Sequence, residues 1–267
     1  MPDASPYDCV LITGASSGLG EEFAIQLASR ARRLVLVARR AALMETLAEG
    51  IRTRFPKIEI IVHAADLADF SERQSLVSSL SAAGLAPDLL INNAGLGDYG
   101  DFASSEWPRI EAMLRVNMEA LTHLTHAMLP SMIRKGGGAV INVSSLASLL
   151  PIPDFAVYAA TKAYVSSFSE ALRIELKPHG IPVLAVCPGP VHTGFGDVAK
   201  RGASGRNVPG REWFFMPKET VVAEALSALD RNRARVYPGL RTAAAALLIS
   251  AVPLLMIRAV MSLRPRS

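Results

Sequence analysis

The sequence predicts an α/β fold: a doubly wound parallel sheet of about seven strands, with helices on both of its faces. Short apolar runs typical of buried parallel strands alternate along the chain with longer segments of helical periodicity. Half of the 267 residues are hydrophobic, which is enough for a large core and argues against disorder. No internal repeat, low-complexity tract or linker interrupts the sequence, so we expect one domain.

The expected elements follow the chain in order, with right-handed crossovers between parallel strands. Strands are expected at 9–13, 34–38, 58–62, 88–92, 139–143 and 183–187, with a short one near 235–237. Helices are expected at about 19–30, 40–54, 70–83, 106–134, 155–178 and 218–230. Residues 194–216, rich in Gly, Pro, Arg and aromatic residues, are expected to form one long loop. Such loops are often functional lids, although a surface loop pinned by its aromatic side chains is the alternative.

A glycine-rich turn directly follows the first expected strand. The apolar run ends at Thr13, and a helical pattern begins at Glu21. Glycines between them let the backbone bend sharply and approach a pyrophosphate, whose charge is favoured at a helix N-terminus. This order of elements favours a dinucleotide site over a plain strand–helix connection. The residues expected to contact the nucleotide are Gly14, Ser16, Ser17, Gly18, Leu19 and Gly20.

Tyr158 and Lys162 lie four residues apart in an expected helix, which places them on one face. A free tyrosine titrates near pH ~10, and a neighbouring cation lowers such a pKa by ~1–3 units. The pair is therefore a candidate proton relay for carbonyl and alcohol chemistry. By itself the spacing is also that of an ordinary exposed helix face.

Further motifs accompany these two: Asn92-Asn-Ala-Gly95, Asn117, Ser145 and Pro188-Gly-Pro-Val-His-Thr193. Together with Thr13-Gly-x3-Gly-x-Gly20 and Tyr158-x3-Lys162, their order and separations resemble those of the classical short-chain dehydrogenase/reductase family. The resemblance covers roughly residues 6–195. It implies a single-domain Rossmann fold, with an NADP-binding catalytic domain at 1–240 in which residues 194–216 are the substrate loop.

The resemblance also implies catalytic roles for four residues. In the family the catalytic serine lies thirteen residues before the tyrosine, which selects Ser145 over Ser144. Its hydroxyl would donate to the substrate oxygen, and Tyr158 would exchange a proton with that oxygen. Lys162 would lower the pKa of Tyr158 and bind the nicotinamide ribose, and Asn117 would hold Lys162 through a water.

The end of the second strand bears on the choice of nucleotide. An acid there would accept the ribose hydroxyls of NAD and repel a 2′-phosphate, but this chain has Ala38 followed by Arg39 and Arg40. A guanidinium binds phosphate bidentately, so we expect NADP(H), bound by Arg39. The alternative is that both arginines only begin a solvated helix. By resemblance, further cofactor contacts are expected from Asp66, Leu67, Asn93, Ala94, Gly95, Tyr158, Lys162, Pro188, Gly189, Val191 and Thr193.

The C-terminal segment, residues 241–267, differs in character from the rest. The chain carries 28 basic and 24 acidic residues, yet residues 231–267 contain seven arginines and no acid. Sixteen uncharged residues separate Arg241 from Arg258, fewer than the ~20 of a spanning helix. Three interpretations stay open: a helix packed on the domain or on a second subunit, an interfacial helix on anionic lipid, or a membrane span.

These observations predict an NADP(H)-dependent oxidoreductase that interconverts a carbonyl and a secondary alcohol and acts on an apolar or lipid-like substrate. A non-catalytic NADP-binding sensor and an extended-type epimerase or dehydratase are the alternatives. The resemblance implies a dimer or tetramer. Two cysteines in apolar runs and a start unlike a signal peptide suggest a cytoplasmic protein, with possible peripheral membrane contact. The histidines lack metal-ligand spacing and the basic residues lack aromatic interleaving, so neither a metal nor a nucleic acid is expected.

Overall fold

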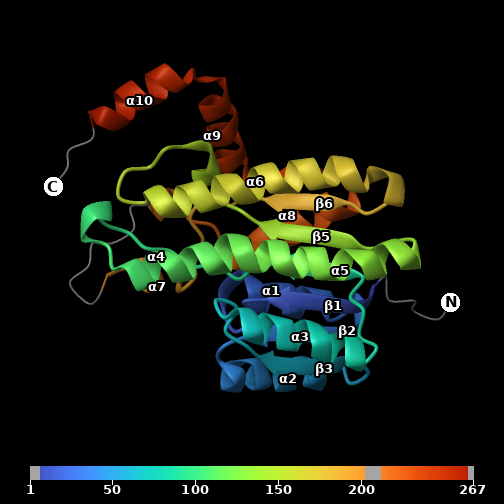
Figure 1. The fold of residues 1–267 in the computed structure, drawn as a ribbon. Coiled ribbons are helices and arrows are strands. Elements are labelled where there is room, and N and C mark those ends of the chain that lie inside the picture. The colour runs from blue at the N-terminus through green and yellow to red at the C-terminus, as the bar shows by residue number, and fades with distance from the viewer. Residues whose placement is uncertain (1–6, 202–211, 264–267) are drawn as a thin grey trace.

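The computed structural model describes residues 7–201 and 212–263, and it confirms the predicted fold class. A single sheet of seven parallel strands has the order β3-β2-β1-β4-β5-β6-β7 (Figure 1). The chain order reverses between β1 and β4, which is where such sheets bind ligands. The strands are β1 (Tyr7–Thr13), β2 (Ala31–Ala38), β3 (Glu59–Ala64), β4 (Leu89–Asn92), β5 (Ala139–Val143), β6 (Val183–Val186) and β7 (Arg235–Val236).

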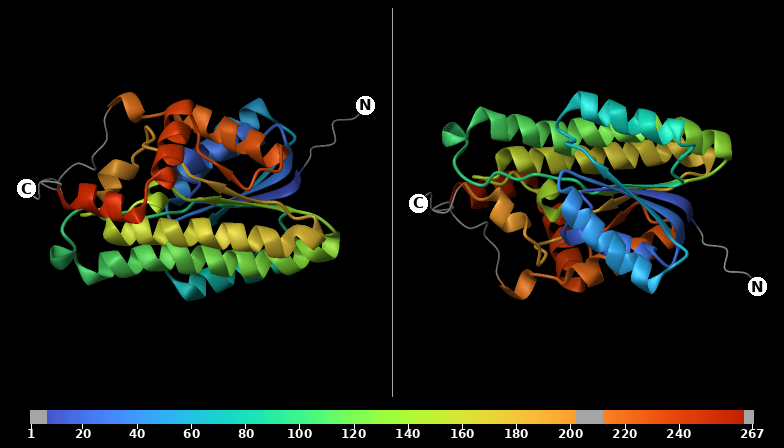
Figure 2. Two further views of the ribbon diagram at one scale, coloured as in Figure 1. Left: turned by 90° about the horizontal axis from the view of Figure 1, so that it is seen from above. Right: turned by 90° about the horizontal axis from the view of Figure 1, so that it is seen from below.

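Helices cover both faces of the sheet (Figure 2). Helices α1 (Gly18–Leu27), α2 (Ala41–Arg54) and α8 (Lys218–Asp230) bury their apolar sides in one core. Helices α3 (Phe70–Ala82), α5 (Leu121–Lys135) and α6 (Ala156–Leu176) bury theirs in the core on the other face. Because parallel strands are buried on both faces, they read as continuous apolar runs, which made them visible in the sequence.

The helix expected at 106–134 is present as one unbroken helical run, but its middle is π-helical rather than α-helical. It consists of α4 (Trp107–Leu114), a π-helical segment η2 (Arg115–Ala120) and α5. Asn117 lies in η2, where its side chain bonds to the backbone of Leu96. A π-helical turn widens the helix by one residue, which an apolar pattern does not reveal, and such turns are frequent at functional sites.

The loop expected at 194–216 contains helical structure. Helix α7 (Phe195–Ala199) opens it, and the 3₁₀ turn η5 (Glu212–Phe214) precedes its end. Val191 pairs with Met216 as a short parallel bridge that closes the base of the loop. Residues 202–211 lie outside the described residues. Other 3₁₀ turns are η1 (Phe102–Ser104), η3 (Leu146–Leu149) and η4 (Lys177–His179).

The C-terminal segment forms two helices rather than the one expected, α9 (Leu240–Ala251) and α10 (Leu254–Ser262). They are bent by 111° at Pro253, which precedes α10. Proline cannot donate the helical hydrogen bond and keeps Val252 extended, so α9 ends there. Among the described residues no single helix is long and apolar enough to cross a bilayer, although α9 and α10 together meet that criterion as a bent pair. Arg264 and Arg266 lie outside the described residues.

Candidate active site

The glycine turn between β1 and α1 has no room for side chains at two of its three glycines. A Cβ on Gly20 would lie 2.3 Å from the carbonyl oxygen of Gly14, and a Cβ on Gly14 would lie 2.9 Å from Cα of Ala94. Gly14 and Gly18 also have positive φ, at 67° and 62°. The backbone can therefore present itself directly to a ligand at the N-terminus of α1, as a pyrophosphate requires.

The turn is fastened to the end of β4. Nδ2 of Asn93 donates to the carbonyl oxygen of Thr13 at 2.9 Å, and Oγ1 of Thr13 accepts from the backbone amides of Asn93 and Ala94, both at 3.0 Å. The Asn93 side chain thus braces the turn rather than pointing freely toward a nucleotide. Gly95 follows, and a Cβ there would lie 3.4 Å from Nζ of Lys162. The predicted nucleotide and catalytic residues meet at this edge.

Arg40 is a site residue that the sequence interpretation assigned no role. Its Nη2 donates to the hydroxyl oxygens of Ser16, at 3.0 Å, and Ser17, at 2.8 Å. Arg39, the predicted phosphate ligand, is 62% exposed and its Nη1 lies 3.9 Å from a carboxylate oxygen of Asp66. Two cations and two hydroxyls therefore lie where the nucleotide's adenosine phosphate is expected. The only sequence signal for Arg40 was its position next to Arg39.

The other cofactor residues predicted by resemblance gather at the same edge. Thr193 lies beside the glycine turn, since a Cβ on Gly18 would be 3.2 Å from its Cγ2. Pro188 accepts a hydrogen bond from the amide of Leu146, at 2.8 Å, and Gly189 lies against Thr242 of α9. Leu67 is buried, whereas Asp66 is partly exposed. With the crowded glycines and the arginine–serine cluster, this set fits a phosphate-bearing dinucleotide.

Tyr158 and Lys162 lie on one turn of α6, facing the end of β5. Nζ of Lys162 donates to the carbonyl oxygen of Val143 at 2.8 Å and lies 5.7 Å from the centroid of the Tyr158 ring. Ser145, at the N-cap of η3, shares a hydrogen bond with Tyr158. Ser144 is used differently, because its hydroxyl donates to the carbonyl oxygen of Lys162 at 2.8 Å. The structure thus brings Ser145, Tyr158 and Lys162 together.

Burial dominates the electrostatics of this group. It raises the pKa of Tyr158 to about 12, against a smaller lowering by the hydrogen bond with Ser145. It lowers the pKa of Lys162 to about 8. The predicted lowering of the Tyr158 pKa by Lys162 is not seen here: loss of water around the phenol raises the pKa, and the hydrogen bond with Ser145 opposes that rise only in part. Tyr158 is held as a protonated acid at neutral pH.

Asn117 is fixed by three hydrogen bonds within the protein. Its Oδ1 accepts from the amide of Leu96 at 2.8 Å, and its Nδ2 donates to the carbonyl oxygen of Leu96 at 2.9 Å and to Oγ1 of Thr161 at 3.0 Å. Thr161 in turn donates to the carbonyl oxygen of Tyr158. Asn117 therefore couples the loop after β4 to the helix that carries Tyr158 and Lys162, the predicted catalytic pair. A water-mediated contact with Lys162 stays a prediction.

An aromatic cluster closes over Tyr158. The ring of Phe155 stacks on it at 4.2 Å between centroids, and Phe195 of α7 packs at 5.4 Å. Tyr99 meets Phe155 edge-on at 5.7 Å. Phe195 also packs closely on the backbone of Gly97, because a Cβ there would lie 2.8 Å from the Phe195 ring. Helix α7 is thus an apolar cover on Tyr158, the predicted catalytic tyrosine.

A buried carboxylate holds the far end of that cover. The Asp98 side chain is only 3% exposed. It forms ion pairs with Nη2 of Arg201, at 2.7 Å, and with Nε of Arg109, at 3.1 Å. The backbone amide of Tyr99 donates to the carbonyl oxygen of Ala199 alongside, at 2.9 Å. This cluster was not predicted, because Asp98 and Arg201 are separated by 103 residues.

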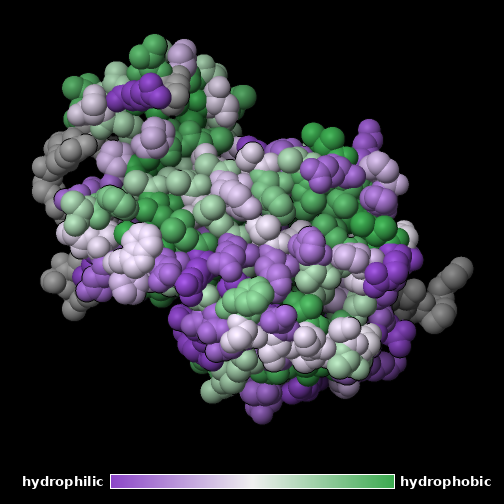
Figure 3. Space-filling model, in the orientation of Figure 1, coloured by the Kyte–Doolittle hydropathy of each residue, from purple (hydrophilic) through white to green (hydrophobic). Residues whose placement is uncertain are grey.

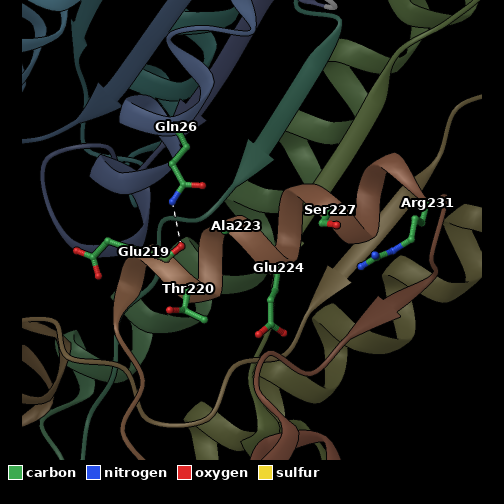
Figure 4. A pocket seen from close by; sticks show the side chains of 7 residues that line it. All are labelled: Gln26, Glu219, Thr220, Ala223, Glu224, Ser227 and Arg231. Carbon is green, nitrogen blue, oxygen red and sulfur yellow. Dashed lines mark hydrogen bonds between the residues drawn. The ribbon is translucent and has the colours of Figure 1, made fainter.

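Other features of the described residues do not compete for this role. No group of three or more His, Cys, Asp and Glu side chains within them is placed to bind a metal. Cys9 and Cys187 are buried free thiols. A surface hollow along α8 is lined by residues that include Gln26, Glu219 and Arg231, none of which belongs to the predicted site (Figure 4).

Comparison with known proteins agrees with this geometry. The sequence profile of the family described as short chain dehydrogenase matches residues 8–202. A sulfoacetaldehyde reductase of Chromohalobacter salexigens is 38% identical over 193 residues, which are 70% of this chain and 74% of that protein. A very-long-chain 3-oxoacyl-CoA reductase of Phaeosphaeria nodorum is 33% identical over 230 residues, 83% of this chain and 63% of that protein.

Solved structures agree as well. A short-chain dehydrogenase from Sphingobium yanoikuyae in complex with NADPH is 31% identical and matches with a TM-score of 0.80 over 97% of both chains. The family profile covers well over half of this chain, and the fold matches over nearly all of it. The chain belongs to the short-chain dehydrogenase family of oxidoreductases.

Proposed function

We propose that this protein is an NADP(H)-dependent oxidoreductase that interconverts a carbonyl and a secondary alcohol on an apolar or lipid-like substrate. The observation that carries the proposal is the buried group of Ser145, Tyr158 and Lys162 beside the glycine turn. A sensor of nucleotide would need the turn but not this group.

The residues divide the chemistry as follows. The bound nicotinamide supplies or accepts the hydride. In reduction, Tyr158 donates its phenolic proton to the substrate oxygen, while the Ser145 hydroxyl donates a hydrogen bond to the same oxygen. Lys162, held on the carbonyl oxygen of Val143, provides the cation that stabilises the phenolate left behind. In oxidation the same groups act in reverse.

The preference for NADP(H) rests on charge. The end of β2 carries Arg39 and Arg40 with no acid, and Arg40 already binds the hydroxyls of Ser16 and Ser17. A 2′-phosphate there would receive charge-assisted hydrogen bonds. The related structure in complex with NADPH supports this assignment.

The apolar substrate class rests on the cover over Tyr158. Phe155, Tyr99 and Phe195 surround the phenol. The nearby cations Arg109 and Arg201 are paired with Asp98, which leaves them poorly placed to bind an anionic substrate. The aromatic side chains over Tyr158 therefore suit a long-chain acyl substrate, as in the name of the Phaeosphaeria relative, better than a small sulfonate such as sulfoacetaldehyde.

The test is oxidation of NADPH and NADH by the purified protein over a graded panel of ketones, with sulfoacetaldehyde as the small anionic member. We expect turnover with NADPH and a kcat/KM that rises as the apolar chain of the ketone lengthens. Equal use of NADH would contradict the cofactor assignment. Preference for sulfoacetaldehyde would contradict the substrate class.

We also propose a homo-oligomer, supported by resemblance to the family, and a cytoplasmic location, supported by the two free buried cysteines. Mass measurement by light scattering tests the first, and fractionation of the native host tests the second. A monomer or a secreted protein, respectively, would contradict them.

A further inference from the structure

Exposed apolar side chains are concentrated in the C-terminal arm, defined as residues 240–263. Sixteen large hydrophobic residues are exposed in the described parts of the chain, and half of them lie in this arm. Figure 3 shows them as a hydrophobic region over α9 and α10. They are Leu240, Leu247, Leu248, Val252, Leu255, Met256, Val260 and Leu263. A surface of this kind is typical of an interaction site.

The base of the arm is fixed to the active-site end of the domain. Thr242 and Ala246 are buried, and Thr242 lies beside Gly189 in the predicted nicotinamide-binding segment. Nη1 of Arg241 donates to the carbonyl oxygen of Trp213 at 2.5 Å, with its guanidinium over the Trp213 ring. Helix α9 also packs on η3, which begins directly after Ser145. One face of α9 is therefore part of the domain, and its other face is not.

Helix α10 turns away from α9 and is exposed on most of its length. After the 111° bend it lies at the end of the molecule that also carries α7 and the start of α4 (Figures 1 and 2). Leu255 is 78% exposed and Val260 67%. Nine residues of helix are about 14 Å long, too short to cross a membrane but sufficient to lie along its surface.

Charge distinguishes between the possible partners. No acidic residue occurs between 231 and 267, and Arg258 stands on α10 among the exposed apolar side chains. Two copies joined symmetrically through this arm would bring like charges together with no acid of the arm to offset them. Anionic headgroups complement the arginines, and acyl chains accept the leucines.

We propose that the C-terminal arm docks on an anionic lipid bilayer, with α10 in the plane of the interface and the active-site end of the domain facing the membrane. The proposal concerns the arm alone and does not depend on which reaction the site performs. If the proposed function also holds, an apolar substrate would reach the site from the bilayer.

The test is flotation of the full chain with vesicles of phosphatidylcholine containing about 30% phosphatidylglycerol, and with vesicles of phosphatidylcholine alone. The variants are Leu255→Glu and Arg258→Gln in the arm. Leu43→Glu is the matched control, since Leu43 is an exposed leucine on α2. Circular dichroism establishes that each variant is folded, and light scattering measures its mass.

We expect the wild-type chain and Leu43→Glu to float with the anionic vesicles. Leu255→Glu should lower the bound fraction by about tenfold, and Arg258→Gln should lower it on anionic vesicles only. If the wild-type chain binds neither kind of vesicle, the proposal is overturned. So would a folded Leu255→Glu that binds vesicles normally but changes from dimer to monomer, since the arm would then be a subunit interface. Neither result involves turnover, so a failure of the docking proposal can be distinguished from a failure of the proposed function.

Discussion

Nη2 of Arg201 lies 2.7 Å from Oδ2 of Asp98, and this contact joins the end of the lid to the loop after β4. Burial raises the pKa of Asp98, but hydrogen bonds from Arg201, Ser105 and Arg109 and the charge of Arg201 outweigh it and hold the pKa below its usual value. The carboxylate is therefore charged at neutral pH. Helix α7, with Phe195 on the Tyr158 ring, is held down by this ion pair.

Arg201→Gln should loosen the lid while leaving Asp98 paired with Arg109. Because α7 would cover the substrate less tightly, we expect KM for the ketone to rise several-fold and kcat to change less. The free energy of unfolding should fall by roughly 1 kcal/mol, since Arg201 is partly exposed. Steady-state kinetics and urea unfolding measure both effects. Lys200→Gln, which breaks only the exposed pair with Asp197, is the control, and an equal effect there would contradict the role of Arg201.

Lys162→Met should stabilise the fold at neutral pH and abolish turnover. The pKa of Lys162 in the folded chain, about 8, lies below the ordinary lysine value of 10.5, so the unfolded chain binds the proton more tightly. Burial of the ammonium therefore lowers the free energy of unfolding. The full penalty applies below pH 8, and it disappears as the pH rises from 8 to 10.5. The variant also loses the hydrogen bond to Val143. With that loss included, its free energy of unfolding at pH 7 should exceed that of wild type by about 1–3 kcal/mol.

Urea unfolding at pH 7 and at pH 10 measures this difference. The gap between Lys162→Met and wild type should be largest at pH 7 and should shrink at pH 10. Lys57→Met, at an exposed position, should show no gap at either pH. A variant less stable than wild type at pH 7 would contradict the assigned cost of burial.

Arg40→Gln should raise KM for NADPH by about tenfold, because one charge-assisted contact to the 2′-phosphate is lost. KM for NADH, which lacks that phosphate, should change little. Arg39→Asp should shift the preference toward NAD(H), since a carboxylate repels the phosphate and accepts ribose hydroxyls. Arg32→Gln, far along β2 and 75% exposed, is the control. Parallel changes in both KM values for Arg40→Gln would place Arg40 outside the phosphate site.

Gly20→Ala should lower the free energy of unfolding by roughly 1–3 kcal/mol and prevent nucleotide binding, because its Cβ meets backbone at 2.3 Å. Gly50→Ala should instead raise the free energy of unfolding. Nothing lies within 4 Å of its added Cβ in α2, so a gain of about 0.5–1 kcal/mol is expected. Thermal unfolding and fluorescence titration with NADPH measure the pair. Tolerance of alanine at both positions would contradict the geometry of the turn.

The sequence was informative where one local pattern determines a position. Buried parallel strands such as Leu34–Ala38 read as apolar runs, and the spacing of Tyr158 and Lys162 placed them on one turn of α6. The π-helical turn at Asn117, whose side chain bonds to the backbone of Leu96, is not encoded by any periodicity. The bend at Pro253 had a signal in the proline itself.

Contacts between distant segments could not be predicted in this way. Arg201 and Asp98 meet only after the sheet and lid are assembled, and neither residue belongs to a motif. Arg39 and Arg40 are adjacent and identical residues, so the sequence does not show which partner each side chain has. In the structure Arg40 bonds to the serines of the glycine turn, whereas Arg39 lies near Asp66. The raised pKa of Tyr158 likewise follows from Phe155 and Phe195 closing around the ring, which spacing along α6 does not reveal.

The most direct test of the account compares Tyr158→Phe with wild type in two measurements: NADPH affinity by fluorescence titration, and NADPH oxidation with the best ketone of the panel. The substitution keeps the ring that packs on Phe155 and removes only the hydroxyl that we propose as the proton donor. We predict unchanged NADPH affinity and a loss of turnover by a factor of about 10²–10⁴. A variant that binds NADPH and still turns over at the wild-type rate would contradict the account.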